Sequence, residues 1–376
     1  MLFPALPTPA LLLDREVLQR NIDHMAEKAS ALGVELRPHI KTHKCVEIAR
    51  LQRERGARGI TVATLAEARA FAAAGFDDIT HAYPLDPGKF ATALELAGEI
   101  TLRLTLDDAA VARALDAAAS ERGQTVHIWL KVDCGNHRAG VDPDSDTALQ
   151  LARTLHAAGS LTFDGILTHA GQAYRAGSAA ELRRIAAHER DVMVSFARRL
   201  READISVAAV SVGATPAMSA VDHLEGVDEA RPGNYVFYDG TQLALGSCVL
   251  EDCAVAVLTT VVSKQPGRGQ VVVDAGALAL SHDPGPVHLD ARPSRGAVYA
   301  GADPPALHPV LRVVSVTQEH GIIAGDSPDD VADLSVGDRL RILPNHACLA
   351  APLFDAYAVV QGGQVVDRWT VHRGRA

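Results

Sequence analysis

The stretch RPHIKTHK, residues 37–44, places two lysines among an arginine and two histidines. A lysine acts as a nucleophile only when part of it is neutral, and burial or neighbouring cations achieve this by lowering its pKa. Lys41 has such cations on both sides along the chain, and a neutral Lys41 could form an imine with a carbonyl compound. Taken alone, the stretch is more typical of a solvated loop in which Lys41 and Lys44 are both exposed.

A second group of residues could bind a phosphate. SVGATPAMSA (residues 211–220) is expected to form a strand, a tight glycine turn and a short helix. Backbone N–H groups at the helix start and the Thr215 hydroxyl would form an anion site, and PGN (residues 232–234) follows the next strand. The alternative is that Gly213 and Gly233 form ordinary turns. Together with an imine-forming lysine, a phosphate site indicates pyridoxal 5′-phosphate chemistry.

Two further side chains could contact such a cofactor. Arg138 lies in DCGNHRAG (residues 133–140) and could hydrogen-bond the phenolic oxygen of the cofactor or a substrate carboxylate. The alternative for Arg138 is a structural ion pair with Asp133. His169, in THAG, could lie flat against the cofactor ring, or it could be a hydrogen-bonded core histidine.

A possible metal site lies near the C-terminus, in NHAC (residues 345–348). If the preceding strand continues through this motif, its alternation places His346 and Cys348 on one face. One imidazole and one thiolate could form half of a zinc site, although the bare pattern also arises by coincidence. Two protein ligands leave positions for water or substrate, which is the arrangement of a catalytic metal.

These residues fall at the ends of a regular series of predicted strands. Short apolar segments, most of them followed by helical stretches such as 65–75 and 107–123, indicate parallel strands with helical crossovers. Eight such units in about 200 residues fit a (β/α)₈ TIM-like barrel, in which active sites lie at the carboxyl ends of the strands. No G-x-G-x-x-G follows the first strand, so a dinucleotide fold is not indicated. The predicted strands are 35–42, 59–64, 78–83, 102–106, 127–133, 163–170, 208–214 and 229–237.

The pattern changes after the eighth strand. Hairpin-like pairs of apolar segments replace the helices, with Pro-Gly and Gly-Gly at two of the turns. We therefore predict an α/β protein of two domains. A barrel covers residues 15–243, and a mostly β domain consists of residues 1–14 and 244–376.

Composition limits the possible partners. The formal net charge of −10 argues against a nucleic-acid partner, and no apolar run is long enough to cross a membrane. The first ten residues lack the basic start of a secretion signal. Five cysteines without a repeating spacing are typical of a reduced protein, so we expect a cytoplasmic location.

The motifs, taken in order, resemble those of a known family. They are RPHIKTHK, DCGNHRAG, THAG, SVGATP, RPGNYVFYD and PNHAC, and they extend over essentially the whole chain. Together they resemble the D-serine dehydratase and D-threonine aldolase group of fold-type III pyridoxal-phosphate enzymes, which are relatives of alanine racemase. The resemblance implies a barrel of the alanine racemase N-terminal type, a second β domain and a homodimer.

The resemblance also implies roles for individual residues. Lys41 would carry the cofactor, Arg138 would contact its phenolic oxygen, and Tyr174 resembles an active-site tyrosine of the family. Arg231 lies where alanine racemase has an arginine facing the pyridine nitrogen, but dehydratases of this group do not all keep it, so its role stays open. The residues that we predict to bind the cofactor are Lys41, Arg138, His169, Tyr174, Gly213, Thr215, Gly233 and Asn234.

The metal motif distinguishes the subgroups. Aldolase-like members usually have H-x-D at this position and dehydratases have H-x-C, so His346 and Cys348 resemble the dehydratase ligands of a divalent metal, expected to be Zn²⁺. A QEHG motif (residues 318–321) also recurs in the group, and its His320 could approach the active site or be structural.

The predicted function is therefore metal-dependent elimination of water from a D-3-hydroxy amino acid. D-Serine would give pyruvate and ammonia, and D-threo-3-hydroxyaspartate would give oxaloacetate and ammonia. Three alternatives remain open at this point. They are an aldolase acting on D-threonine or D-3-hydroxyaspartate, an amino-acid racemase, and a non-catalytic pyridoxal-phosphate carrier, although such carriers lack a second β domain.

Overall fold

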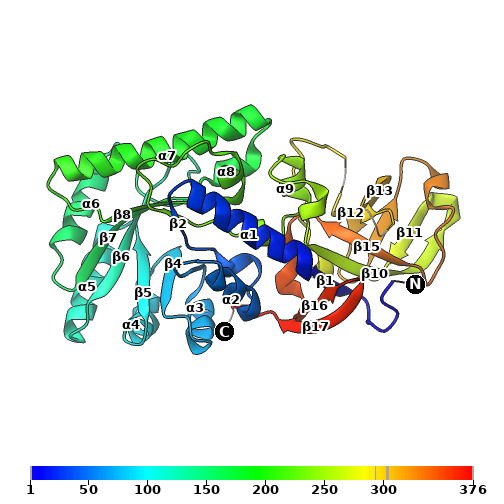
Figure 1. The fold of residues 1–376 in the computed structure, drawn as a ribbon, viewed down its shortest axis with the longest axis horizontal. Helices are drawn as coiled ribbons and strands as arrows, with labels where there is room; N and C mark the ends of the chain where they lie inside the picture. The colour runs from blue at the N-terminus through cyan, green and yellow to red at the C-terminus, as the bar shows by residue number, and fades with distance from the viewer. Residues whose placement is uncertain (1, 293, 302–304, 375–376) are drawn as a thin grey trace. The chain divides into compact units, whose positions relative to one another are not determined.

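The structure is a computed structural model that describes residues 2–292, 294–301 and 305–374. The chain forms two compact units (Figure 1). The unit that we call the barrel unit contains residues 24–41, 48–233 and Gly374. The other, called the sheet unit, contains residues 2–23, 42–47 and 234–373. The domain boundaries predicted from the sequence stay a prediction.

The barrel unit confirms the predicted (β/α)₈ fold. Its eight strands all pair in parallel in the order β2-β9-β8-β7-β6-β5-β4-β3. A parallel bridge between His39 and Thr61 joins the two ends of this series and closes the barrel. The strands are β2 (Glu35–Leu36), β3 (Ile60–Val62), β4 (Asp78–Pro84), β5 (Thr101–Leu106), β6 (Val126–Lys131), β7 (Leu161–Leu167), β8 (Ala209–Val212) and β9 (Glu229–Ala230).

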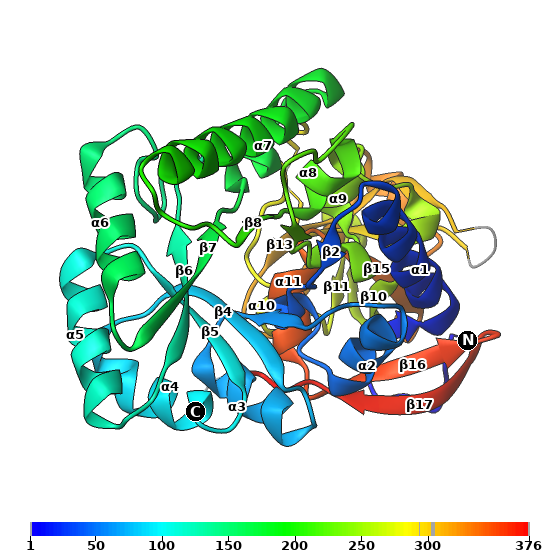
Figure 2. The same ribbon diagram turned by 60° about the vertical axis from the view of Figure 1, so that its left-hand side comes forward.

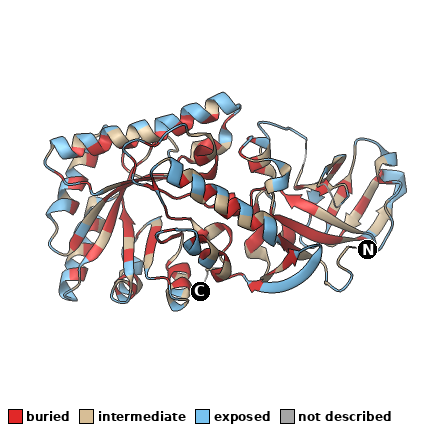
Figure 3. Cartoon of the chain, in the orientation of Figure 1, coloured by how far each residue is buried: buried red, intermediate tan, exposed pale blue. Residues whose placement is uncertain are grey.

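Helices connect the strands, and α4 to α7 lie outside them (Figure 2). Several begin at side chains that accept hydrogen bonds from the first free N–H groups, as Thr64 does in a capping box with Glu67 and as Asp108 does for α5. Figure 3 shows buried strands and helices that are exposed along one face. The helices are α1 (Arg15–Ala31), α2 (Val46–Glu54), α3 (Leu65–Ala73), α4 (Phe90–Ala97), α5 (Ala109–Glu121), α6 (Asp146–Ala157), α7 (Ala179–Glu202) and α8 (Thr215–Ala220).

Two predicted strands are shorter than expected. The strand predicted at 35–42 ends at Leu36, and the strand predicted at 229–237 ends at Ala230. Pro38 and Pro232 follow these ends, and a proline has no N–H to continue a ladder. The chain continues in 3₁₀ turns at Ile40–Thr42 and Asn234–Val236, so several of the predicted site residues lie on turns rather than on strands.

A layer of charged side chains fills part of the barrel interior, where apolar residues are usual. Arg37, with 2% of its side chain exposed, donates hydrogen bonds to both Glu229 and Asp78. Arg103 then joins Asp78 to Asp164. These ion pairs connect the β2–β9 side of the barrel to strands β4, β5 and β7.

The sheet unit is mostly β, as predicted. Its nine strands lie in the order β11-β14-β13-β12-β15-β10-β1-β16-β17, and the N-terminal strand β1 pairs with both β10 and β16. The strands are β1 (Ala10–Asp14), β10 (Val255–Gln265), β11 (Gln270–Val273), β12 (Gly296–Tyr299), β13 (Leu307–Val316), β14 (Gly321–Ala324), β15 (Arg339–Pro344), β16 (Ala356–Gln361) and β17 (Gln364–Thr370).

Besides the first residues of α1 and α2, the sheet unit contains three short helices. They are α9 (Gly240–Ala244), α10 (Ala277–Leu280) and α11 (Ala347–Ala350). None of the helices in the described part of the chain combines the length and apolar composition that crossing a membrane requires.

Candidate active site

Lys41 lies half-buried in the 3₁₀ turn that follows β2. It belongs to a cluster of cationic side chains of the barrel unit, called the cation cluster, whose other members are Lys131, Arg138 and Arg231. Burial and then the charges of Lys41 and His169 hold the pKa of His39 well below its usual range. His39 is therefore neutral at pH 7. Lys44 lies two residues before the start of α2 and is half-buried rather than exposed, and its carbonyl accepts a 2.6 Å hydrogen bond from the His372 N–H.

His169 follows β7 and is fixed by a hydrogen bond. Its Nδ1 donates to the Gly213 carbonyl at 2.6 Å. Burial, followed by the charges of Lys41 and Lys131, holds the pKa of His169 well below its usual range. Because the proton of this neutral ring is on Nδ1, Nε2 carries a lone pair. The hydrogen bond fixes the ring and is compatible with both roles predicted for His169.

The turn after β8 leaves no room for a side chain at Gly213. Its φ is +158°, and a Cβ at this position would lie 2.7 Å from the Arg231 backbone nitrogen. Thr215 begins α8 with 1% of its surface exposed. The strand, glycine turn and short helix predicted for SVGATPAMSA are therefore present, and the turn brings backbone close to backbone as a phosphate cradle requires.

Arg231 is buried, and its guanidinium is engaged by the protein. It donates hydrogen bonds to the Ser211 hydroxyl and to the Thr168 carbonyl. These bonds tie the segment after β9 to the ends of β8 and β7.

Two buried residues of the barrel unit were not predicted from the sequence. Lys131 ends β6 with 5% of its surface exposed, and burial, Arg231 and Arg138 lower its pKa to about 7. Glu189, in the middle of α7, accepts hydrogen bonds from the N–H groups of Ala170 at 3.0 Å and Gly213 at 3.2 Å through one oxygen. Lys131 could have been found from its place at a strand end, whereas nothing in the helical pattern distinguishes Glu189.

The loop after β6 holds Arg138 at the protein surface. Its charge lowers the pKa values of Lys131 and His169, so it lies near both. The Asp133 carboxylate accepts hydrogen bonds from the N–H groups of Gly135 and His137 and pairs with the His137 ring at 3.0 Å, rather than forming the ion pair considered for Arg138. Tyr174 lies half-buried in a 3₁₀ turn, Gly171–Arg175.

In the sheet unit, His346 and Cys348 lie at the start of a helix and not on a strand, so the argument from strand alternation was wrong. Strand β15 ends at Pro344, His346 is the N-cap of α11, and Cys348 is the second residue of that helix. The two side chains nevertheless hydrogen-bond to each other. The Thr42 hydroxyl lies 3.1 Å from the Cys348 sulfur.

The donor set of this pair fits a borderline-soft metal such as Zn²⁺. His346 Nδ1 lies 3.3 Å from an Asp283 oxygen, an outer hydrogen bond that would leave Nε2 for a metal. Burial opposes the charged form of His346, but Cys348 and Asp283 outweigh it and raise the pKa of the ring to about 11. Among the residues that the structure describes, no group of three or more His, Cys, Asp or Glu side chains is arranged to hold a metal.

The other sequence-predicted residues divide between the units. Gly233 belongs to the barrel unit, and Asn234 begins a 3₁₀ turn of the sheet unit, with 2% of its surface exposed.

His320 is exposed in the turn between β13 and β14, where its carbonyl accepts a hydrogen bond from the Thr317 N–H at 2.8 Å. This contact favours the structural role for the QEHG motif.

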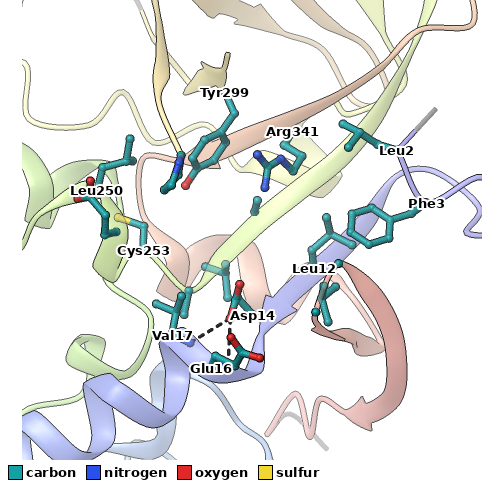
Figure 4. A pocket seen from close by; sticks show the side chains of 18 of the residues that line it. Leu2, Phe3, Leu12, Asp14, Glu16, Val17, Leu250, Cys253, Tyr299 and Arg341 are labelled. Carbon is teal, nitrogen blue, oxygen red and sulfur yellow. Dashed lines mark hydrogen bonds between the residues drawn. The ribbon is translucent and has the colours of Figure 1, made fainter. Parts of the chain in front are cut away.

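A cavity of about 680 Å³ within the sheet unit contains none of the predicted site residues (Figure 4). Its wall includes Tyr299, with the Arg341 guanidinium 4.9 Å from the ring centre, together with Phe3, Leu12 and Cys253. This cavity is therefore separate from the cation cluster and from the His346–Cys348 pair.

Comparison with known proteins decides the family. Residues 13–240 match the alanine racemase N-terminal domain, and residues 254–360 match the putative serine dehydratase domain. The chain belongs to the alanine racemase-like, fold-type III family of pyridoxal-phosphate enzymes. Within this family the chain is 40% identical to D-threo-3-hydroxyaspartate dehydratase of Delftia sp. (strain HT23), with 97% of each chain covered. It is 37% identical to D-serine dehydratase of Dictyostelium discoideum, with 96% of this chain and 95% of the relative covered.

Other members of the family have different activities. The chain is 30% identical to D-threonine aldolase of an Arthrobacter species, over 97% of this chain and 92% of the relative. The solved structure of the Delftia dehydratase superimposes with a TM-score of 0.93 at 39% identity, covering 97% of both chains. The family resemblance inferred from the six motifs is thus confirmed.

Proposed function

We propose that the protein is a pyridoxal-phosphate- and metal-dependent dehydratase of D-3-hydroxy amino acids. The similarity to the Delftia dehydratase over nearly the whole chain carries this proposal. The adjacent His346 and Cys348 side chains support it, since the related structures include a cysteine-to-alanine variant of the Delftia enzyme in the metal-free form. The substrate would be D-serine or D-threo-3-hydroxyaspartate, and the metal would be Zn²⁺.

The residues proposed to hold the cofactor have distinct tasks. Lys41 would carry it covalently, and the glycine turn after β8 would hold its phosphate with Thr215 and Gly233. Neutral His169 is fixed by Gly213, and a neutral ring beside the cofactor does not repel a cationic group. Arg138 would contact the phenolic oxygen, while Tyr174 and Asn234 complete the proposed set.

The chemistry of the proposed reaction is the loss of the α-proton and of the 3-hydroxyl. When bound, the cofactor withdraws electrons from the α-carbon, and a divalent metal acts as a Lewis acid. Lys41 Nζ would accept the α-proton. His346 and Cys348 would hold the metal that binds the 3-hydroxyl, and Asp283 would orient the His346 ring. The products would be a 2-oxo acid and ammonia.

Product analysis tests the reaction directly. Purified protein is incubated with D-serine, D-threonine and D-threo-3-hydroxyaspartate, with and without added zinc, after exhaustive chelation. We expect a 2-oxo acid and ammonia, formed only when zinc is present. Full activity after chelation would overturn the role of the metal.

Two variants separate the cofactor from the metal. Lys41→Ala is expected to abolish covalent attachment of the cofactor, measured by borohydride reduction and mass spectrometry, whereas Lys44→Ala keeps it. Cys348→Ala is expected to keep the cofactor but to lose zinc-dependent turnover. The reverse outcome for the two lysines would show that Lys41 is not the attachment site.

An aldolase is the second candidate, because an aldolase relative covers nearly the whole chain at 30% identity. It would break the bond between the α- and β-carbons instead of removing water. Formation of glycine and an aldehyde from D-threonine or D-3-hydroxyaspartate would support the aldolase over the dehydratase.

We also propose that the protein is a cytoplasmic homodimer. The family resemblance supports the dimer, and the unpatterned cysteines support the reducing compartment. Light scattering coupled to size exclusion should give twice the 39.7 kDa mass of the chain. A monomer at micromolar concentration would refute the dimer, and cell fractionation tests the location.

A further inference from the structure

The Asp239 carboxylate joins two segments of the sheet unit that the proposed function assigns to different ligands. Asp239 has none of its surface exposed and is the N-cap of α9. One oxygen, Oδ2, accepts hydrogen bonds from Asn234 Nδ2 at 2.6 Å and from the Ala347 N–H at 2.9 Å. The other, Oδ1, accepts from the Gln242 N–H at 2.9 Å.

The two hydrogen-bond donors to Oδ2 belong to segments proposed to bind different ligands, the cofactor and the metal. Asn234 is proposed to bind the cofactor, and its own side chain is buried. Ala347 lies between His346 and Cys348, so the position of its N–H fixes the backbone that carries both proposed metal ligands. A shift of Asp239 would therefore move both segments at once.

A second contact fixes the same pair of elements. The Asn345 carbonyl accepts hydrogen bonds from the Thr241 N–H at 3.0 Å and from the Thr241 hydroxyl at 2.8 Å. Asn345 Nδ2 in turn donates to the Asp283 and Ser294 carbonyls. The start of α9 and the segment at the start of α11 are thus joined by two residues on each side, Asp239 and Thr241 on one and Asn345 and Ala347 on the other.

We propose that Asp239 is a positioning residue that couples cofactor binding to metal binding. This inference rests on the proposed function and adds a residue that touches neither ligand. Because Oδ2 holds Asn234 and Ala347 together, occupancy of the metal pair should tighten cofactor binding. By thermodynamic reciprocity the cofactor should tighten metal binding by the same factor.

The experiment measures both affinities in the full-length protein. Cofactor-free protein is titrated with pyridoxal 5′-phosphate by absorbance, once after chelation and once with zinc. Zinc affinity is measured by competition with a chromophoric chelator. Asp239→Asn keeps the size of the side chain but replaces one acceptor oxygen with an NH₂ group, which cannot accept from the N–H donors around it.

We expect Asp239→Asn to weaken the binding of both pyridoxal 5′-phosphate and zinc about tenfold or more, and to abolish the effect of one ligand on the other. Asp283→Asn is the matched control, since it removes the negative charge beside His346 Nδ1 and should weaken zinc binding alone. Thr241→Val removes the hydroxyl contact of α9 with Asn345, keeps Asp239, and should preserve the coupling.

If Asp239→Asn fails to fold, Asn234→Ala tests the same inference. The Asn234 side chain is connected through Asp239 to Ala347, which lies between His346 and Cys348. Removing that side chain should therefore lower zinc affinity as well as cofactor affinity. Unchanged zinc affinity would overturn the inference. A folded Asp239→Asn variant that loses only one ligand, or neither, would also overturn it while leaving the proposed function intact. Wild-type protein that binds neither ligand would instead refute the proposed function, and the inference with it.

Discussion

Buried charged residues at the ends of β6, β7 and β8 hold the groups proposed to contact the cofactor. Glu189 binds the N–H groups of the turns that carry His169 and Gly213, and these two residues hydrogen-bond to each other. Lys131 lies near His169, and burial, Arg231 and Arg138 lower the pKa of Lys131 to about 7. The site therefore combines a buried carboxylate, Glu189, with several cationic side chains. The contribution of Glu189 and of Lys131 to stability can be tested by titration and substitution.

Lys131 should make the stability of the cofactor-free protein depend on pH. Its pKa is lowered to about 7 in the folded state, against about 10.4 in an unfolded chain. Between these values the unfolded state binds the additional proton. The free energy of unfolding should thus fall as the pH decreases from about 10 to about 7, by roughly 1 kcal/mol per pH unit from this residue.

Lys131→Met should remove this dependence. Urea unfolding of the cofactor-free wild type and variant, measured between about pH 7.5 and 9.5, should give a smaller slope for the variant. Lys264→Met, the same change on β10, is the control and should retain the wild-type slope. Equal slopes for wild type and Lys131→Met would show that Lys131 has the same pKa in the folded and unfolded states.

Glu189 should matter more for its hydrogen bonds than for its charge. Glu189→Gln keeps an oxygen that can accept from both N–H groups and should lower the free energy of unfolding by no more than about 1–2 kcal/mol. Glu189→Ala leaves two buried donors without a partner and should lower it by about 3 kcal/mol or more. The control is Glu202→Ala at the exposed end of the same helix, expected within about 0.5 kcal/mol of wild type. Similar losses for the Gln and Ala variants would contradict this order.

At the scale of secondary-structure elements, the ion pairs around Arg37 stabilise the contacts between barrel strands. This guanidinium pairs with Glu229 on β9 and Asp78 on β4. Removing it would take the ion pair from buried Glu229, which keeps the hydrogen bond from the Ser211 hydroxyl, and would leave Asp78 with its Arg103 ion pair. Arg37→Met should therefore lower the free energy of unfolding by about 3–5 kcal/mol.

Arg58→Met provides a matched comparison for the Arg37 prediction. Its ion pair with Glu35 is about half exposed, with 56% and 50% of the two side chains accessible, so its loss should change stability by less than about 1 kcal/mol. Both variants are measured by urea denaturation at low salt. Losses of equal size would mean that the interior ion pairs are no more important than surface ones.

The order of the elements could be predicted from the sequence, but the ends of some could not. Strand and helix periodicity gave eight βα units because each strand is buried and each helix has one apolar face. Prolines at positions 38 and 232 ended β2 and β9 early, a signal that was present in the sequence but outweighed by the apolar pattern. His346 and Cys348 lie together, but the strand argument for their proximity was wrong because α11 begins where the strand was extended; their role as metal ligands stays a prediction. Glu189 and Asp239 could not be found, because their roles arise from contacts with residues distant in the chain.

At the scale of the whole molecule, the sheet unit is assembled from separate parts of the chain. Strand β1, at the N-terminus, lies between β10 and β16, and all three of Leu11, Leu12 and Leu13 are buried. The Tyr357 hydroxyl donates to the His43 carbonyl at 2.6 Å, across 314 positions of sequence. The barrel sequence thus lies between segments that must meet before this unit is complete, and such distant contacts slow folding.

Leu13 gives a sharp test of this dependence on β1. Its side chain has none of its surface exposed and lies in register with Val255 on one side and Val359 on the other. Leu13→Asp places a charge without a partner inside the sheet and should lower the free energy of unfolding by more than about 4 kcal/mol.

Val365→Asp also replaces an apolar side chain with Asp, on the edge strand β17, where 41% of the residue is exposed. It should lower the free energy of unfolding by less than about 1 kcal/mol. The two tryptophans make the measurement specific, because Trp369 lies in the sheet unit and Trp129 lies in the barrel unit. In a Trp129→Phe background, the fluorescence of Trp369 reports on the sheet unit alone. Leu13→Asp should shift its unfolding to much lower urea than Val365→Asp does. Equal urea midpoints for the two variants would mean that the sheet unit is stable without its N-terminal strand. This would require β10 and β16 to be stable as the edges of two separate sheets.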